Sequence, residues 1–296
     1  MNEAQTLLDI ENFMLSVSRR NYHWKDFASD YGQWLDDARF VYDDELEYSP
    51  LIQAYFDLMP ERIDWCNQDI FDDRCTFKSF QGSLRMRQQY FLNDFTDKVE
   101  DNLAQFSSYF DQLFQKHCKL LLVRVDLYYL FEHSPSIREF DRDIKKLINR
   151  IQNKDTIFKD QVGYAYRLEQ GGKSKGYHCH LLVIYNGSIR RRDSYYGQAI
   201  GELWQGHITQ GCGYFYNGNQ ESHKKYYESQ GKLGIGKLER KDVEGLGNVR
   251  LANTLKAIRY LAEPEKNHQY LRVRLNKMRA FSKALFKPSA RHKSKH

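Results

Sequence analysis

The sequence has few cysteines and prolines and no long hydrophobic run. Its five cysteines and five prolines are scattered through 296 residues, and no two cysteines form a CxxC pair. This spacing excludes a zinc ribbon and a disulfide scaffold, and it is typical of the reducing cytoplasm. No apolar run approaches the roughly 18 residues of a membrane span. The first residues, MNEAQTLLDIENF, lack the pattern of a secretory signal, so we expect a cytoplasmic protein with no membrane partner.

Positive and negative charges are unevenly distributed along the chain. The net charge is +6. Residues 1–116 carry about −11, residues 117–240 about +7 and residues 241–296 about +10. A basic surface of this kind attracts a polyanion such as a nucleic acid. The alternative is that the lysines and arginines only solvate helix faces, and composition alone does not decide between the two.

Three regions follow from the patterning. Residues 1–116 place apolar side chains at helical spacing between carboxylates, which predicts a mainly helical acidic region. Residues 117–285 alternate strand-like and helix-like segments, and residues 286–296 form a basic tail that we expect to be flexible. The acids between Asp36 and Glu47 are either a metal site or a solvated face, and we favour the solvated face.

The middle region predicts a fold of the α+β class. Runs of β-branched and aromatic residues predict strands, and apolar residues at helical spacing predict helices between them. The expected strands cover residues 119–131, 161–170, 177–185 and 207–217. The expected helices cover residues 134–153, 194–206 and 248–266, with a mobile connection over 217–247. This order of elements predicts a central antiparallel sheet backed by helices.

Two histidines lie two residues apart at the start of the strand expected over 177–185. Because alternate strand residues share a face, His178 and His180 point together, while Cys179 points away and is expected to be a small packed hydrophobe. A hairpin places Glu169 beside them across the turn QGGKSKG. Two imidazoles and a carboxylate with room for water suit Mg²⁺ or Mn²⁺ acting on a phosphate. The competing interpretation is a partly exposed histidine pair near an exposed glutamate.

These residues resemble a known family. The resemblance lies in GYAYRLEQGGKSKGYHCHLLVIYNG, then IGELWQGHITQGCGYFYN, then AIRYLAEPEKNHQYLRV, and covers roughly residues 117–285. These segments are similar to the prophage-encoded YagK/YfjJ C-terminal domain family and the gene II replication protein of filamentous phages. The histidine pair resembles the His-hydrophobic-His (HUH) motif of rolling-circle replication initiators. The resemblance implies a ferredoxin- or RRM-like HUH palm and a metal-dependent single-strand DNA endonuclease with a tyrosine nucleophile.

The resemblance points to Tyr260 as the nucleophile among the 21 tyrosines. In initiators of this class the tyrosine follows the histidine strand, on a helix near the metal, and Tyr260 lies in the helix expected over 248–266. A tyrosine hydroxyl can attack a phosphodiester and hold the cut end covalently. Lys256 lies one helical turn earlier on the same face and would favour the phenolate and the phosphate charge. The alternative is that Tyr260 is a core aromatic among apolar neighbours.

The surroundings of Tyr260 depart from the family pattern. The family commonly has a lysine three residues after the tyrosine, where this chain has Glu263, so either Lys256 or Lys266 substitutes or the activity is weakened. Some members carry a second tyrosine one turn away. Lys256 and Pro264 occupy those positions here, which predicts a single-tyrosine enzyme. Tyr270 is a second candidate nucleophile, although we favour a strand aromatic.

An aspartate lies inside the first expected strand, in LLVRVDLYY. Asp126 matches a polar position of the family's first motif, and this resemblance implies that it orients a ligand histidine through a hydrogen bond. The same carboxylate can instead pair with Arg124. Both interpretations stay open at the level of the sequence.

The resulting expectation is a rolling-circle replication initiator. It would nick and join single-stranded or hairpin origin DNA and leave a 3′-hydroxyl for a host polymerase, with a host helicase because no helicase motif is visible. Basic side chains would hold the DNA backbone, namely Lys173, Lys175, Arg190, Arg191, Arg192, Arg259 and Lys266. Two rival functions are a transposase or relaxase with the same chemistry and a non-catalytic DNA-binding regulator with a decayed site.

Overall fold

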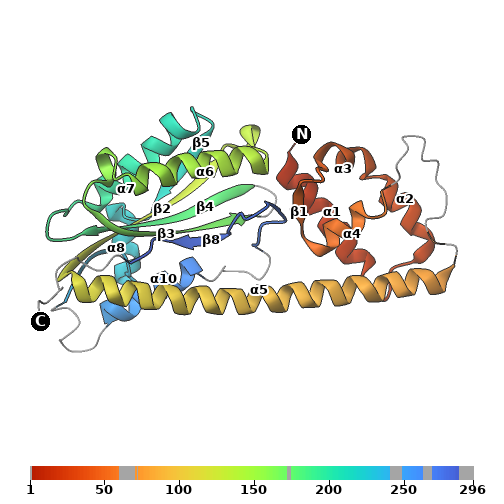
Figure 1. Ribbon diagram of the computed structural model, residues 1–296, viewed down its shortest axis with the longest axis horizontal. Helices are drawn as coiled ribbons and strands as arrows, with labels where there is room; N and C mark the ends of the chain where they lie inside the picture. Colours follow the sequence, from red (N-terminus) through yellow and green to blue (C-terminus); the bar gives the residue numbers. More distant parts are fainter. Residues whose placement is uncertain are drawn as a thin grey trace, which may run out of the picture.

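One long helix, α5 (Arg74–Lys116), runs along the molecule and carries a group of helices at one end and a sheet at the other (Figure 1). The carboxylate of Asp73 accepts hydrogen bonds from the first backbone amides of α5 and so caps it. Phe77 and Leu84 of α5 pack with the N-terminal helices, and Phe106 and Phe110 pack under the sheet. The two ends of the molecule therefore share one continuous element.

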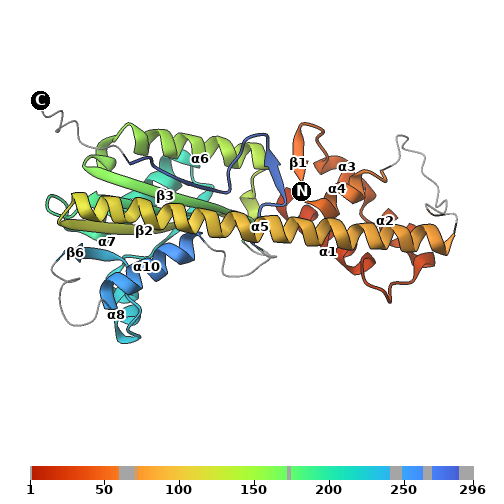
Figure 2. The ribbon, with the colours of Figure 1, turned by 60° about the horizontal axis from the view of Figure 1, so that its bottom comes forward.

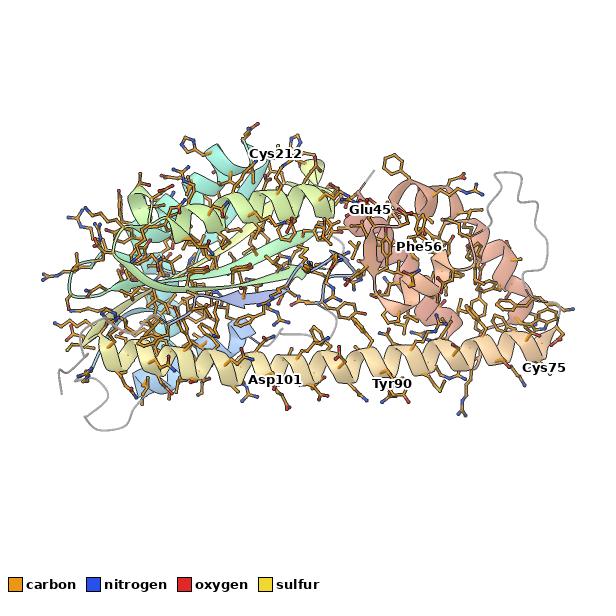
Figure 3. All side chains as sticks on the ribbon, viewed as in Figure 1. Glu45, Phe56, Cys75, Tyr90, Asp101 and Cys212 are labelled. Carbon is orange, nitrogen blue, oxygen red and sulfur yellow. The ribbon has the colours of Figure 1, made fainter. Side chains whose placement is uncertain are left out.

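The structure, a computed structural model, describes residues 2–59, 71, 73–171, 175–240, 249–262 and 269–286, apart from the side chains at positions 250, 260 and 262. None of the described helices is both long enough and apolar enough to span a bilayer. Tyr90 and Asp101 lie on the side of α5 that faces away from the sheet (Figure 3).

The N-terminal region is helical, as the sequence predicts. It contains α1 (Glu3–Val17), α2 (Phe27–Gly32), α3 (Leu35–Val41) and α4 (Pro50–Phe56), with a short 3₁₀ turn η1 (Trp24–Asp26). Its core is rich in aromatic rings, which bury much apolar area per residue. A short strand, β1 (Leu46–Tyr48), pairs antiparallel with β7 (Val273–Leu275), so segments from opposite ends of the chain lie side by side.

The central sheet is antiparallel throughout, which confirms the predicted α+β class. Its strands are β2 (Lys119–Tyr129), β3 (Gln161–Gln170), β4 (Tyr177–Asn186), β5 (Gly213–Asn217) and β8 (Phe281–Lys283). They lie in the order β5-β2-β4-β3-β8, and β6 (Gly236–Glu239) also pairs with β2. The first four strands and the helices between them have the connectivity of a ferredoxin-like split βαβ unit.

Helices cover both faces of this sheet. On one face lie α6 (Ile137–Gln152) and α7 (Asp193–Glu202), with the short turns η2 (Phe131–His133) and η3 (Thr156–Phe158) beside them. On the other face lie α5 and α10 (Val249–Ala262), which Figure 2 shows side by side. Along β2 and β4 the odd-numbered residues face α6 and the even-numbered residues face α5 and α10. This alternation decides which side chains can meet.

Two sequence predictions in the last part of the sheet are wrong. The strand expected over 207–217 begins only at Gly213, because α7 continues as a π-helical segment η4 (Leu203–Ile208) that buries Trp204. The indole Nε1 of Trp204 donates to the carbonyl of Tyr128 and packs against Gly213. The connection expected to be mobile contains α8 (Glu221–Ser229) and β6. The ammonium of Lys224 in α8 contacts Asp193 and so ties α8 to α7.

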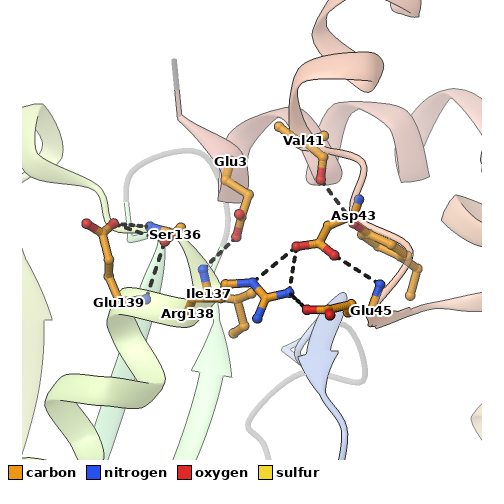
Figure 4. Close-up of polar contacts among 9 residues, drawn as sticks. Glu3, Val41, Asp43, Glu45, Ser136, Ile137, Arg138 and Glu139 are labelled. Atoms are coloured by element: carbon orange, nitrogen blue, oxygen red, sulfur yellow. Dashed lines mark hydrogen bonds and ion pairs between the residues drawn. The ribbon is translucent and has the colours of Figure 1, made fainter.

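The helical end and the sheet end are joined by polar contacts (Figure 4). Arg138 of α6 donates to Asp43 at 2.7 Å and to Glu45 at 2.7 Å. The carboxylate of Glu3 accepts from the backbone amide of Ile137 at 2.8 Å. The capping box of Ser136 starts α6 at this junction. Part of the acidic face of the N-terminal region therefore binds a basic residue of the same chain.

Candidate metal centre

The strand register brings the predicted metal ligands together. Glu169 in β3 lies directly opposite His178 in β4, and Asp126 in β2 lies directly opposite His180. Directly opposite residues project from the same face of a sheet. All four side chains therefore lie on the face that α5 and α10 cover, at the end of β4 where the hairpin begins.

Glu169, His178 and His180 form a group whose donor atoms all lie within 4.8 Å of one another. The Oε2 atom of Glu169 lies 3.4 Å from Nε2 of His178 and 3.5 Å from Nε2 of His180. The side chains of Glu169 and His178 are only 3% and 2% exposed, and that of His180 is 15% exposed. The alternative of an exposed glutamate is therefore wrong, whereas of the two histidines only His180 is partly exposed. Two imidazole nitrogens and one carboxylate oxygen that converge on one point fit a divalent ion.

Other polar atoms orient the two imidazole rings. The Nδ1 atom of His180 lies 2.8 Å from Oδ1 of Asp126, and Nδ1 of His178 lies 3.2 Å from the carbonyl oxygen of Gly176. Both rings therefore turn Nε2 toward Glu169. A ligand histidine is commonly held in this way, by a carboxylate or a carbonyl on its other nitrogen. A Cβ at Gly171 would lie 2.6 Å from Cβ of Lys175, so glycine allows the hairpin turn to close beside His178.

Two arginines, the partly buried Arg124 and the buried Arg167, neutralise the carboxylates. The Nε atom of Arg124 lies 3.0 Å from Oδ1 of Asp126, and Nε of Arg167 lies 2.9 Å from Oε1 of Glu169. The interpretation that Asp126 pairs with Arg124 is thus confirmed, and Asp126 contacts His180 as well. That it orients a ligand histidine stays a prediction. Arg167 leaves the second oxygen of Glu169, Oε2, facing the histidines. The sequence reasoning missed Arg167, although its position two residues before Glu169 on a strand predicts a shared face.

The charges of the cluster are strongly coupled. Burial raises the pKa of Glu169, but hydrogen bonds from His178 and His180 outweigh it and lower this pKa to about 2. Burial lowers the pKa of His180, but Asp126 and Glu169 outweigh it and raise this pKa to about 9. The pKa of Asp126 is likewise held below its usual range by Arg124 and His180 against the effect of burial. The carboxylates are therefore ionised at neutral pH, as metal ligands must be.

Aromatic rings line the cluster on the side of β5. The ring of Tyr128 stacks on His178 with centroids 5.3 Å apart, and Tyr214 stacks on Tyr128 at 5.0 Å. Tyr216 lies directly opposite Asp126. The sequence reasoning did not single out these tyrosines. Tyr128 could have been predicted, because it lies two residues after Asp126 in β2 and so shares its face. Tyr214 and Tyr216 could not, because their position beside the cluster depends on the pairing of β2 with β5.

The helix that carries the predicted nucleophile covers the same face of the sheet. Ile258 and Leu261 of α10 are buried in one cluster with Leu182, two residues after His180. Lys256 and Arg259 are exposed on α10. The side chain of Tyr260 lies outside the described part of the chain, as do Glu263, Pro264 and Lys266. The role of Tyr260 stays a prediction.

The remaining DNA-binding candidates that the structure describes lie at both ends of the hairpin. Lys175 is exposed in the turn beside the metal cluster, and Lys173 lies outside the described residues. Arg190 contacts Asp160 at 2.7 Å and the hydroxyl of Tyr196 at 2.8 Å, so it binds neighbouring side chains. Arg191 and Arg192 are exposed, but they follow the far end of β4, roughly 20 Å of strand away from His180.

Two further predictions concern packed residues. Cys179 is fully buried among apolar side chains on the α6 face, which confirms that it packs as a small hydrophobe, and burial raises the pKa of its thiol. Tyr270 is buried just before β7, and its hydroxyl donates to Glu11 at 2.9 Å. Tyr270 is thus a packed aromatic with a committed hydroxyl, although it precedes the strand.

The chain was compared with protein-family models, curated proteins and solved structures, and none of these matched.

Proposed function

We propose that this protein nicks and rejoins single-stranded DNA to start rolling-circle replication, using a divalent metal ion and a tyrosine nucleophile. The observation that supports the proposal best is the convergence of Glu169, His178 and His180 on one point of a sheet face. The helix α10, which contains Tyr260, packs on that same face. The resemblance of the three sequence segments to HUH initiators supplies the reaction type.

Glu169, His178 and His180 would hold the ion, with Mg²⁺ and Mn²⁺ as the expected metals. When bound, the ion polarises the scissile phosphate and offsets the charge that develops on it. Asp126 and the carbonyl of Gly176 keep both imidazoles oriented, and Arg167 holds one oxygen of Glu169. These contacts preorganise the ligands before the substrate arrives.

Tyr260 would carry the covalent step. Its hydroxyl oxygen bonds to the phosphorus atom while the bond from phosphorus to the 3′ oxygen breaks, and the phenol proton ends on that 3′ oxygen. The products are a 5′-phosphotyrosine and a free 3′-hydroxyl that a host polymerase can extend. Attack by a 3′-hydroxyl on the phosphotyrosine reverses the step and rejoins the strand. Lys256 would stabilise the phosphate charge from the preceding turn.

Tyr260→Phe should abolish the covalent adduct and leave DNA binding unchanged, because only the hydroxyl is lost. The measurement is incubation of the full chain with labelled single-stranded DNA and Mn²⁺, followed by denaturing electrophoresis and peptide mapping of the adduct. An adduct that persists in Tyr260→Phe would show that another tyrosine attacks, and peptide mapping would then test Tyr128, Tyr214 and Tyr216 on the metal face.

The second candidate function, a DNA-binding protein that does not cleave, predicts a different result in this assay. It would retain single-stranded or hairpin DNA and form no nick with either Mg²⁺ or Mn²⁺. Glu263, in place of the family's lysine, is the sequence feature that favours this second candidate. His180→Ala separates the two cases, since it should remove nicking in an enzyme and have little effect on affinity in a binding protein.

A further inference from the structure

Two tyrosines of β5 project from the sheet face that carries the metal cluster. Tyr214 lies directly opposite Tyr128, and Tyr216 lies directly opposite Asp126. Both side chains remain accessible, with 38% and 37% of their surface exposed. Exposed aromatic rings beside a candidate catalytic centre offer a flat apolar surface to a ligand.

The rings form a ladder from the metal ligand to the edge of the sheet. His178 and Tyr128 stack at an interplanar angle of 19°, and Tyr128 and Tyr214 stack at 15°. Among the described strands, β5 pairs only with β2, so no strand continues the sheet beyond Tyr214. The last ring of the ladder is that of Tyr214. One of its faces packs on Tyr128, and the opposite face points toward the edge of the sheet.

Tyr216 has a different environment. His223 of α8 stacks on its ring with centroids 4.4 Å apart at 24°. This contact leaves Tyr216 less room for a second planar partner. Tyr214 is therefore the ring at the end of the ladder that a ligand can extend.

We propose that Tyr214 stacks on an unpaired base of single-stranded DNA next to the phosphate at the metal cluster. This inference rests on the proposed function. The distance fits, because two strand spacings, roughly 10 Å, separate His178 in β4 from Tyr214 in β5. A base that flanks the scissile phosphate can therefore reach the ring.

The chemistry of the surface favours this occupant. Every base has a π face, and stacking on an aromatic side chain is the usual way that proteins hold single strands. In a duplex the bases already stack on one another, so an open ring selects unpaired DNA. The exposed Lys256 and Arg259 of α10 lie on the same side of the sheet, and residues 249–262 contain no acid. This helix can attract the phosphates that accompany the base.

The test compares base-dependent binding in Tyr214 variants of the full chain. Fluorescence anisotropy would measure the affinity for a labelled oligothymidylate and for an abasic strand of equal length, with EDTA present to exclude metal effects. Tyr214→Ala should weaken oligothymidylate binding by about 5- to 150-fold and change abasic binding by less than about twofold. Tyr214→Leu should behave like alanine, and Tyr214→Phe should bind as the wild type does.

Tyr195→Ala is the matched control, because Tyr195 is 58% exposed on α7 at the other face of the sheet. It should leave both affinities unchanged. Equal binding by wild type and Tyr214→Ala, or equal losses on both strands, would overturn the stacking role and leave the nicking proposal intact. Base-dependent binding through Tyr214 without nicking in Mn²⁺ would overturn only the nicking. A wild-type protein that binds no single-stranded DNA would overturn both.

Discussion

At the scale of the residue, the candidate metal centre depends on how each donor atom is oriented. His180 has Asp126 on one ring nitrogen and Glu169 near the other. Asp126 is in turn held by Arg124. A ligand histidine that lost Asp126 would rotate more freely and would be a weaker base. Asp126 would therefore act on a bound metal through His180, as a positioning residue.

Asp126→Asn should reduce Mn²⁺ affinity by about 10- to 100-fold, because the contact that orients the His180 ring is weakened. Isothermal titration calorimetry of the full chain with Mn²⁺ measures this change. Asp143→Asn is a matched control, because Asp143 is as buried as Asp126 but lies in α6 on the other face and contacts Tyr129. Similar losses in both variants would mean that the effect on affinity is one of general stability.

Metal affinity should also depend on pH, because metal and proton compete for Nε2 of His180. The pKa of about 9 means that His180 is protonated at pH 7 without metal. Binding at pH 7 should release about one proton, and affinity should rise by about tenfold per pH unit up to about pH 9. Calorimetry in buffers of different ionisation enthalpy counts the protons. An observed enthalpy that is independent of the buffer would show that His180 is already neutral.

At the scale of the element, local patterns predicted most of the sheet. The strands β2, β3 and β4 and the helices α6 and α10 lie within a few residues of their expected ranges. The spacing of His178 and His180 was enough to predict their shared face, because strand side chains alternate. The hairpin turn was enough to place Glu169 beside them.

Local sequence patterns did not predict other elements correctly. The helix around Trp204 was expected to be followed directly by a strand. Instead, a π-helical segment with the buried indole of Trp204 follows the helix, and β5 begins only at Gly213. The segment with α8 and β6 is polar and rich in glycine, which is typical of a loop. It becomes ordered because Lys224 pairs with Asp193 and because β6 pairs with β2. Tertiary contacts override a weak local preference in such segments.

At the scale of the whole molecule, a buried polar network connects the N-terminal region to the sheet. Glu11 of α1 accepts from Ser49 at 2.7 Å and contacts Nε of Arg272 at 2.6 Å. The backbone amide of Arg272 donates to Gln170, whose side chain donates to the carbonyl of Ala4. Gln170 follows the candidate metal ligand Glu169 in β3. The packing of the acidic region therefore supports the strand end that carries a ligand.

Glu11→Ala should destabilise the protein by about 3–5 kcal/mol, because it breaks the buried ion pair between Glu11 and Arg272. Urea unfolding followed by circular dichroism measures the loss. Arg138→Ala is the comparison, since its contacts with Asp43 and Glu45 are solvent-exposed and should contribute far less. Equal losses in the two variants would contradict the network's role in stability.

Local periodicity and a short hairpin were enough to predict the class of the fold, the order of most elements and the shared face of the two histidines. The two arginines that neutralise the carboxylates lie two residues away on the same strands and follow from the same alternation. The groups that reach the histidines from other strands depend on the tertiary structure. Asp126 meets His180 through the pairing of β2 with β4, and Tyr214 reaches the cluster through the pairing of β2 with β5. These contacts join segments 50 or more residues apart in sequence, so they depend on strand order and register, which no local pattern encodes.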